Sequence, residues 1–151
     1  MKAQDIMIKQ VYKVKEEDTV RIFIEKCIEH RISGMPVVND RNEMVAYVSD
    51  GDIMLYIGKH KDRIIDTIYF VHVIKGDGEE FDDRVKRLLH LPVMDIATKK
   101  IIKVSWDEEI EDIAAILAKK QIKKVPVEKD GVLVGIISRG DVMRHSFKAW
   151  M

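Results

Sequence analysis

Two stretches of the chain share the pattern Ser-x-Gly-Asp, and they are Ser49 to Asp52 and Ser138 to Asp141. Each follows an apolar β-like run and precedes a helical one, so both motifs are expected at helix N-termini. Unpaired N–H groups and the helix dipole at such a position favour anions. The two motifs are therefore candidate ligand-binding sites.

The same residues have a simpler interpretation as helix caps. A serine at the N-cap with an acid three residues later forms a capping box, which stabilises a helix by about 1 kcal/mol and binds nothing. Gly51 and Gly140, however, stand in the first helical turn, where glycine costs roughly 0.5 to 1 kcal/mol relative to alanine. Close approach of a ligand, or of another backbone segment, would explain that cost.

The motifs end a duplicated stretch, which runs from Asp5 to Met54 and again from Asp95 to Met143. Turns and helix starts recur together with apolar positions, as in Pro36-Val37 and Pro126-Val127. A repeat of about 50 residues that is present twice predicts two units that bury their apolar faces against each other. Binding is therefore expected in the cleft between the copies.

Each copy is predicted to form a strand, a helix, two strands and a second helix. Apolar residues spaced three and four apart indicate amphipathic helices at 20–28 and 110–118. The remaining expected elements are strands at 35–38, 44–48, 125–127 and 132–137 and helices at 52–59 and 141–150. The sequence thus predicts an α/β (α+β) fold of two pseudo-symmetric β-α-β-β-α repeats packed through their sheets.

Residues 59–91 belong to neither copy, so the expected division is a first repeat at 1–58, an insertion at 59–91 and a second repeat at 92–151. The insertion combines a β-like run at 67–74 with a helical apolar stripe from Phe81 to Leu89. We expect this stripe to pack on the body of the protein or on a second subunit. The acidic residues before it lack the spacing of a calcium loop, and no metal site is predicted.

The ordered duplication of Ile-x-x-(Met/Val)-Pro-Val, an apolar strand and Ser-x-x-Asp resembles a pair of cystathionine-β-synthase (CBS) domains, the arrangement called a Bateman module. The resemblance implies that adenosine-containing ligands bind in clefts between the copies without being chemically changed. The implied ligands are AMP, ADP, ATP or S-adenosylmethionine. The resemblance also implies a homodimer in which two modules meet through their helices.

The resemblance assigns roles to residues in both copies. Asp52 and Asp141 would accept hydrogen bonds from both ribose hydroxyls, for which an acceptor-only carboxylate is suited. The other implied contacts are the serines of the motifs, the backbone at each apolar-Pro step and a hydroxyl after the second opening segment: Ser49, Ser138, Met35, Pro36, Val125, Pro126 and Thr98. Ile8 takes the place of that hydroxyl in the first copy.

The two clefts are not expected to be equal. Before the apolar-Pro step the second copy has Lys123 and Lys124 where the first has Ser33 and Gly34, and inside the motif Arg139 replaces Asp50. At an effective dielectric near 20, a unit-charge pair 4 Å apart is worth about 4 kcal/mol before desolvation. The second cleft is therefore predicted to hold the phosphorylated ligand. The first would be empty or take an adenosyl group without phosphate nearby. Alternatively, the two lysines are only solvent-exposed residues at a helix end, where cations are favourable in any case.

Composition argues against several classes of function. Lys+Arg and Asp+Glu each number 26, so the chain lacks the basic footprint of a nucleic-acid binder. No apolar run approaches the roughly 18 residues of a membrane span, and no secretory signal is recognised. These features predict a cytoplasmic protein that contacts neither nucleic acid nor membrane.

We therefore expect a stand-alone, non-catalytic sensor that binds an adenosyl ligand, requires no cofactor and is read by an unidentified effector protein. No Ser-His-Asp set, cysteine pair, phosphate loop or metal quartet in the sequence indicates catalysis. The main alternative is a ligand-free interaction scaffold in which both motifs only cap helices. An uncharacterised enzyme is the less favoured alternative.

Overall fold

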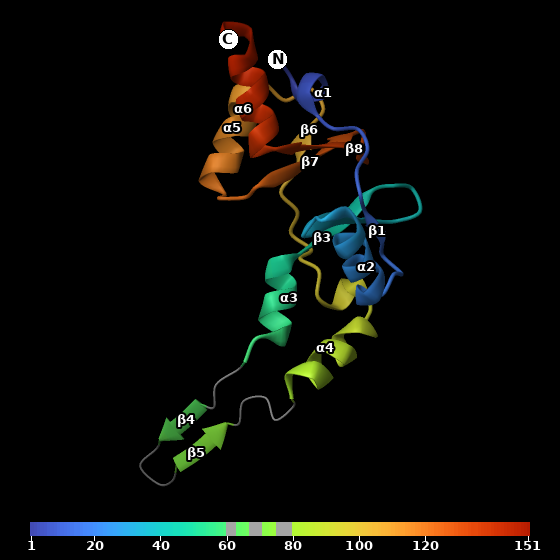
Figure 1. The fold of residues 1–151 in the computed structure, drawn as a ribbon, viewed down its shortest axis with the longest axis vertical. Helices are drawn as coiled ribbons and strands as arrows, with labels where there is room; N and C mark the ends of the chain where they lie inside the picture. The colour runs from blue at the N-terminus through green and yellow to red at the C-terminus, as the bar shows by residue number, and fades with distance from the viewer. Residues whose placement is uncertain (60–62, 67–70, 75–79) are drawn as a thin grey trace.

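Two three-stranded sheets form the body of the protein (Figure 1). This computed structural model describes residues 1–59, 63–66, 71–74 and 80–151. The strands of the first sheet are β1 (Val14–Lys15), β2 (Gly34–Val38) and β3 (Met44–Ser49), and those of the second are β6 (Val104–Ser105), β7 (Lys124–Lys129) and β8 (Val132–Ser138). In each sheet the first strand pairs parallel with the second, which pairs antiparallel with the third. The predicted α/β fold of two equivalent repeats is confirmed.

Helices complete each repeat. The first repeat contains α2 (Val20–His30) and α3 (Asp50–Ile57), and the second contains α5 (Ile110–Lys119), α6 (Arg139–Phe147) and the short η2 (Lys148–Trp150). Both α3 and α6 begin two residues earlier than predicted, because the motif serine is the N-cap residue and the helix starts directly after it. Across the described residues, no helix is long and apolar enough to cross a bilayer.

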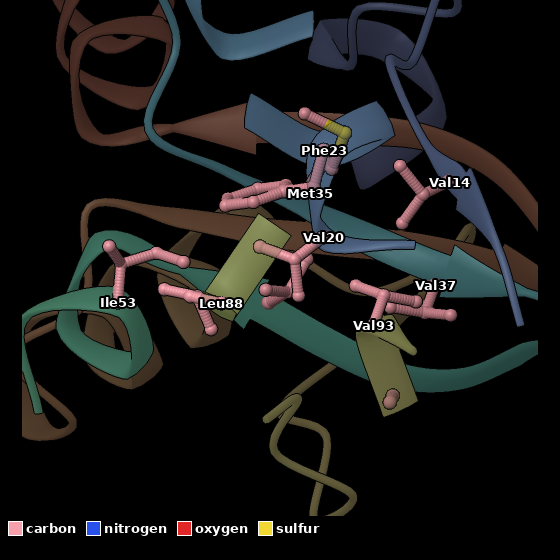
Figure 2. Packing of buried hydrophobic residues seen from close by; sticks show 10 residues of the cluster. Val14, Val20, Phe23, Met35, Val37, Ile53, Leu88 and Val93 are labelled. Carbon is pink, nitrogen blue, oxygen red and sulfur yellow. The ribbon is translucent and has the colours of Figure 1, made fainter. Parts of the chain in front are cut away.

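The last strand of each sheet buries alternate residues, whereas the middle strand buries several in a row. In β3 every second residue is buried, which is the pattern of a strand with one face in the core. Figure 2 shows the first core, where Val14, Phe23 and Met35 from strand and helix meet. A small cluster of Val38, Met44 and Leu133 lies between the two sheets and joins the repeats.

The opening segment of each repeat crosses to the other repeat. Helix α1 (Ala3–Ile6) lies on the second repeat, where the Ala3 N–H donates to the Glu108 carbonyl at 2.8 Å, and Ile8 exchanges two backbone hydrogen bonds with Ile136. In the same way η1 (Val93–Asp95) packs in the first core, and Thr98 exchanges two backbone hydrogen bonds with Tyr47 of β3. This exchange brings Thr98 beside the first motif.

The insertion contributes a hairpin and one helix. Strands β4 (Arg63–Asp66) and β5 (Val71–Ile74) pair antiparallel at the end of the molecule beyond α3 and α4 (Phe81–Leu89) (Figure 1). Residues 67–70 of the predicted β-like run lie outside the described residues. Helix α4 packs on the body of the protein, which is one of the two arrangements that we predicted for it.

Side chains of α4 attach it to the first repeat, and Leu88 and Arg84 are the buried ones. Leu88 is 3% exposed and joins the first core beside Ile53 (Figure 2). Arg84 is also buried, and its Nε and Nη2 donate to the Ile57 carbonyl at the C-terminal end of α3, at 3.3 and 3.2 Å. Phe81, at the start of the predicted stripe, is exposed.

We predict that Leu88→Ala lowers the free energy of unfolding by about 2 to 5 kcal/mol, because it opens a cavity in the first core. The matched variant Phe81→Ala removes a larger but exposed side chain and should change it by no more than about 0.5 kcal/mol. Urea denaturation followed by circular dichroism measures both. Equal effects of the two variants would show that α4 is not attached through Leu88.

Candidate functional site

Both Ser-x-Gly-Asp motifs form the capping boxes that their spacing predicts. The Ser49 N–H donates to Oδ2 of Asp52 at 3.0 Å, and the Ser138 N–H donates to Oδ2 of Asp141 at 2.9 Å. In the second motif the Asp141 N–H also donates to Oγ of Ser138 at 3.1 Å. Helix capping therefore engages one oxygen of each carboxylate. The possible function of each motif depends on the other oxygen, Oδ1.

In the first motif this second oxygen faces a hydroxyl. Oγ1 of Thr98 donates to Oδ1 of Asp52 at 3.1 Å, and the Thr98 side chain is exposed to solvent. The backbone beside it is open, since a Cβ placed on Gly51 would meet only Oγ of Ser49, at 3.6 Å. A ligand could approach this helix start closely, as the glycine suggested.

In the second motif the same position is filled by a cation. Nη2 of Arg144 lies 3.0 Å from Oδ1 of Asp141, and Asp141 is only 6% exposed. A Cβ on Gly140 would lie 2.9 Å from Nη1 of Arg144. The glycine of this motif thus makes room for the guanidinium group, which was not among the explanations that the sequence suggested.

A cavity of about 440 Å³ opens between the two repeats. It is lined by seven of the predicted site residues, namely Ser33, Gly34, Ser49, Thr98, Lys123, Lys124 and Pro126. Asp52 is not itself a lining residue, but it is bonded to Thr98, which is. The other predicted residues do not line the cavity, and they are Met35, Pro36, Val125, Ser138, Arg139 and Asp141.

The sequence predicted cations near one cleft and an extra anion near the other. In the structure, groups of both signs line the same cavity. Lys123 and Lys124 line the same cavity as Asp50, together with Lys100, which the sequence analysis missed. Arg139 points elsewhere: its Nε donates to the Ile122 carbonyl at 2.8 Å and its Nη2 to the Leu117 carbonyl at 3.0 Å. These carbonyls lie at and after the end of α5, where cations are favourable. Three lysines and one carboxylate thus share one cavity.

Tyr47 is a second cavity residue that the sequence analysis missed. Its hydroxyl would lie 3.1 Å from a Cβ on Gly34, so the glycine leaves room for the phenol ring. Burial, with smaller contributions from Asp50 and Cys27, raises the pKa of Tyr47 to about 12, and the phenol is neutral at physiological pH. The sequence did contain a signal for Tyr47. Alternate residues of a strand share a face, so Tyr47 lies on the same face of β3 as the motif residue Ser49.

The cavity can hold a ligand that carries both hydroxyl and anionic groups. Lysine ammonium groups attract anions, and the Asp52 carboxylate accepts hydrogen bonds from hydroxyls. Among the residues that the structure describes, no three His, Cys, Asp or Glu side chains group closely enough to hold a metal ion.

Comparison with known proteins identifies the repeats. A model of the CBS domain family matches residues 3–59 and 93–148. The uncharacterized protein MJ1426 of Methanocaldococcus jannaschii is 32% identical over 151 residues, which cover 95% of this chain and 89% of that protein. The chloroplastic CBS domain-containing protein CBSX1 of Arabidopsis thaliana is 31% identical over 89% of this chain, which spans 58% of its length.

Solved structures share the whole arrangement. CBSX2 of Arabidopsis thaliana, solved in complex with AMP, superposes with a TM-score of 0.74 at 24% identity over 99% of this chain and 98% of that one. The CBS domain pair of protein MJ0100, solved with 5′-methylthioadenosine and S-adenosyl-L-methionine, gives a TM-score of 0.67 at 18% identity, with coverage of 99% and 98%. With two matched repeats and this architecture, the chain belongs to the CBS domain family and contains a tandem pair of CBS domains.

Proposed function

We propose that this chain is a non-catalytic sensor that binds an adenine nucleotide in the cavity between its two CBS domains. The ribose would lie on Asp52 and the phosphate would face Lys123 and Lys124. The observation that carries the proposal concerns the half-buried Asp52 carboxylate. Beyond its own helix cap it accepts a hydrogen bond from Thr98, and Thr98 lines a cavity together with three lysines.

The first motif can exchange its partner at little cost. A ribose hydroxyl that replaces Oγ1 of Thr98 on Asp52 substitutes one neutral donor for another, so the carboxylate loses no charged partner. The capping bond from the Ser49 N–H uses the other oxygen and can persist. Ligand binding and helix capping are therefore compatible at this motif.

The charges of the cavity favour a phosphorylated ligand. Lys100, Lys123 and Lys124 outnumber the single lining carboxylate, Asp50. A nucleotide phosphate is attracted by this excess of cations. S-adenosylmethionine carries a sulfonium, an ammonium and a carboxylate group, and its net positive charge is repelled by the same excess. We therefore propose AMP, ADP or ATP rather than S-adenosylmethionine.

The solved relatives support the choice of an adenosyl ligand. CBSX2 was solved with AMP, and the domain pair of MJ0100 with two adenosyl compounds. Regulation by such a ligand requires different affinities for two arrangements of the protein. A ligand that contacts both repeats in one cavity would bias their relative position, which an effector protein could then read.

The homodimer expected from the family resemblance stays a prediction. Large apolar side chains are exposed on both motif helices, and they are Met54 and Leu55 on α3 and Met143 and Phe147 on α6. This surface is available for contact between two modules through their helices.

We predict that Asp52→Asn weakens AMP binding by at least about 30-fold, since hydrogen bonds to a charged group contribute roughly 1.5 to 3 kcal/mol each. The asparagine oxygen can still accept from the Ser49 N–H, so the helix cap is largely kept. The matched control is Asp141→Asn, which changes the equivalent residue and should leave AMP affinity unchanged. Isothermal titration calorimetry gives both affinities. Unchanged binding in Asp52→Asn, or loss in Asp141→Asn alone, would contradict the assignment of the ribose.

We also predict that the double variant Lys123→Ala/Lys124→Ala binds AMP about 10- to 30-fold more weakly, because each cation within about 4 Å of phosphate contributes roughly 1 kcal/mol even in water. Its affinity for adenosine should not change. Arg139→Ala is the control, because it removes a neighbouring cation whose guanidinium group points to backbone carbonyls. If the control weakens AMP binding as much as the double variant, the phosphate does not lie at the lysines. No binding of any adenine nucleotide would favour the ligand-free scaffold.

A further inference from the structure

Arg144 occupies, in the second motif, the position beside Oδ1 that the Thr98 hydroxyl occupies in the first. Its guanidinium group lies 3.0 Å from Oδ1 of Asp141 and close over the backbone of Gly140. The other oxygen of this carboxylate is held by the Ser138 N–H. Both oxygens of Asp141 therefore have donors within the same helix start, and the residue is buried.

Among the residues that the structure describes, Asp52 has no counterpart of this ion pair. Three residues after Asp52 stands Leu55, whose apolar side chain cannot pair with a carboxylate. The Thr98 hydroxyl beside the first motif is matched by Ile8 beside the second, since each residue forms the backbone bridge to the strand before that motif. The two motifs thus differ in the partner of Oδ1, a neutral hydroxyl in one and a guanidinium group in the other.

We propose that Arg144 closes the second motif to nucleosides and so limits the module to one bound nucleotide for each chain. This inference rests on the proposed function, in which a ribose binds the motif carboxylate. A diol that replaces Arg144 exchanges an ion pair with Asp141 for uncharged hydroxyl donors, so the carboxylate loses the attraction of the opposite charge. It also leaves the buried Asp141 without its cation, which is unfavourable. At Asp52 a ribose hydroxyl would replace the neutral hydroxyl of Thr98, so no charged partner is lost.

The test counts the equivalents of AMP that bind to each chain by isothermal titration calorimetry. The wild-type protein should bind one equivalent. Arg144→Leu, which places the residue of the first copy in the second, should bind two, and the further change Asp141→Asn should return the number to one. A second variant, Arg144→Leu/Ile8→Thr, adds the hydroxyl that the first copy obtains from Thr98. Urea denaturation confirms that each variant is folded.

Two results would overturn the proposal. The first is a wild-type protein that binds two equivalents of AMP, one of which is lost in Asp141→Asn. The second is a single equivalent in Arg144→Leu and again in Arg144→Leu/Ile8→Thr, because the ion pair would then not be what closes the motif. Failure of the proposed function is distinct from both, since in that case no variant, including the wild type, binds AMP.

Discussion

The shared constraint on both motifs is that an aspartate at a helix start has two oxygens and the helix cap engages only one of them. The bond from the serine N–H positions the carboxylate through Oδ2 and leaves its Oδ1 to another donor. Whatever reaches that oxygen decides the role of the repeat. The partner of Asp52 is a neutral hydroxyl, whereas the buried Asp141 is paired with the guanidinium group of Arg144. Two motifs of the same sequence pattern therefore have different chemistry.

The exchange of opening segments explains how a hydroxyl reaches Asp52. Thr98 belongs to the sequence of the second repeat, but it exchanges two backbone hydrogen bonds with Tyr47 of β3. These bonds hold Thr98 at the edge of the first sheet. The following residues lead back toward the second sheet and line the cavity with Lys100. One crossing segment thus joins the ribose side of the proposed site to its phosphate side.

The sequence predicted the repeats, their strands and helices and the two capping boxes, because apolar periodicity and capping spacing are local signals. It could not predict which sheet each opening segment joins, since a duplicated pattern is the same whether the segments cross or not. Nor could it predict the hydrogen bonds of Arg139. A cation beside a motif was expected to face the ligand, and in the structure its guanidinium group donates to the Ile122 and Leu117 carbonyls. The Asp141 to Arg144 pair had a usable signal, because residues three apart on a helix are neighbours.

The most direct test of the central claim is a crystal structure of the chain grown with AMP. The account predicts both ribose hydroxyls within hydrogen-bond distance of the Asp52 carboxylate, the phosphate directed toward Lys123 and Lys124, and Arg144 still paired with Asp141. A ribose bound to Asp141, with only solvent in the cavity beside Asp52, would contradict it.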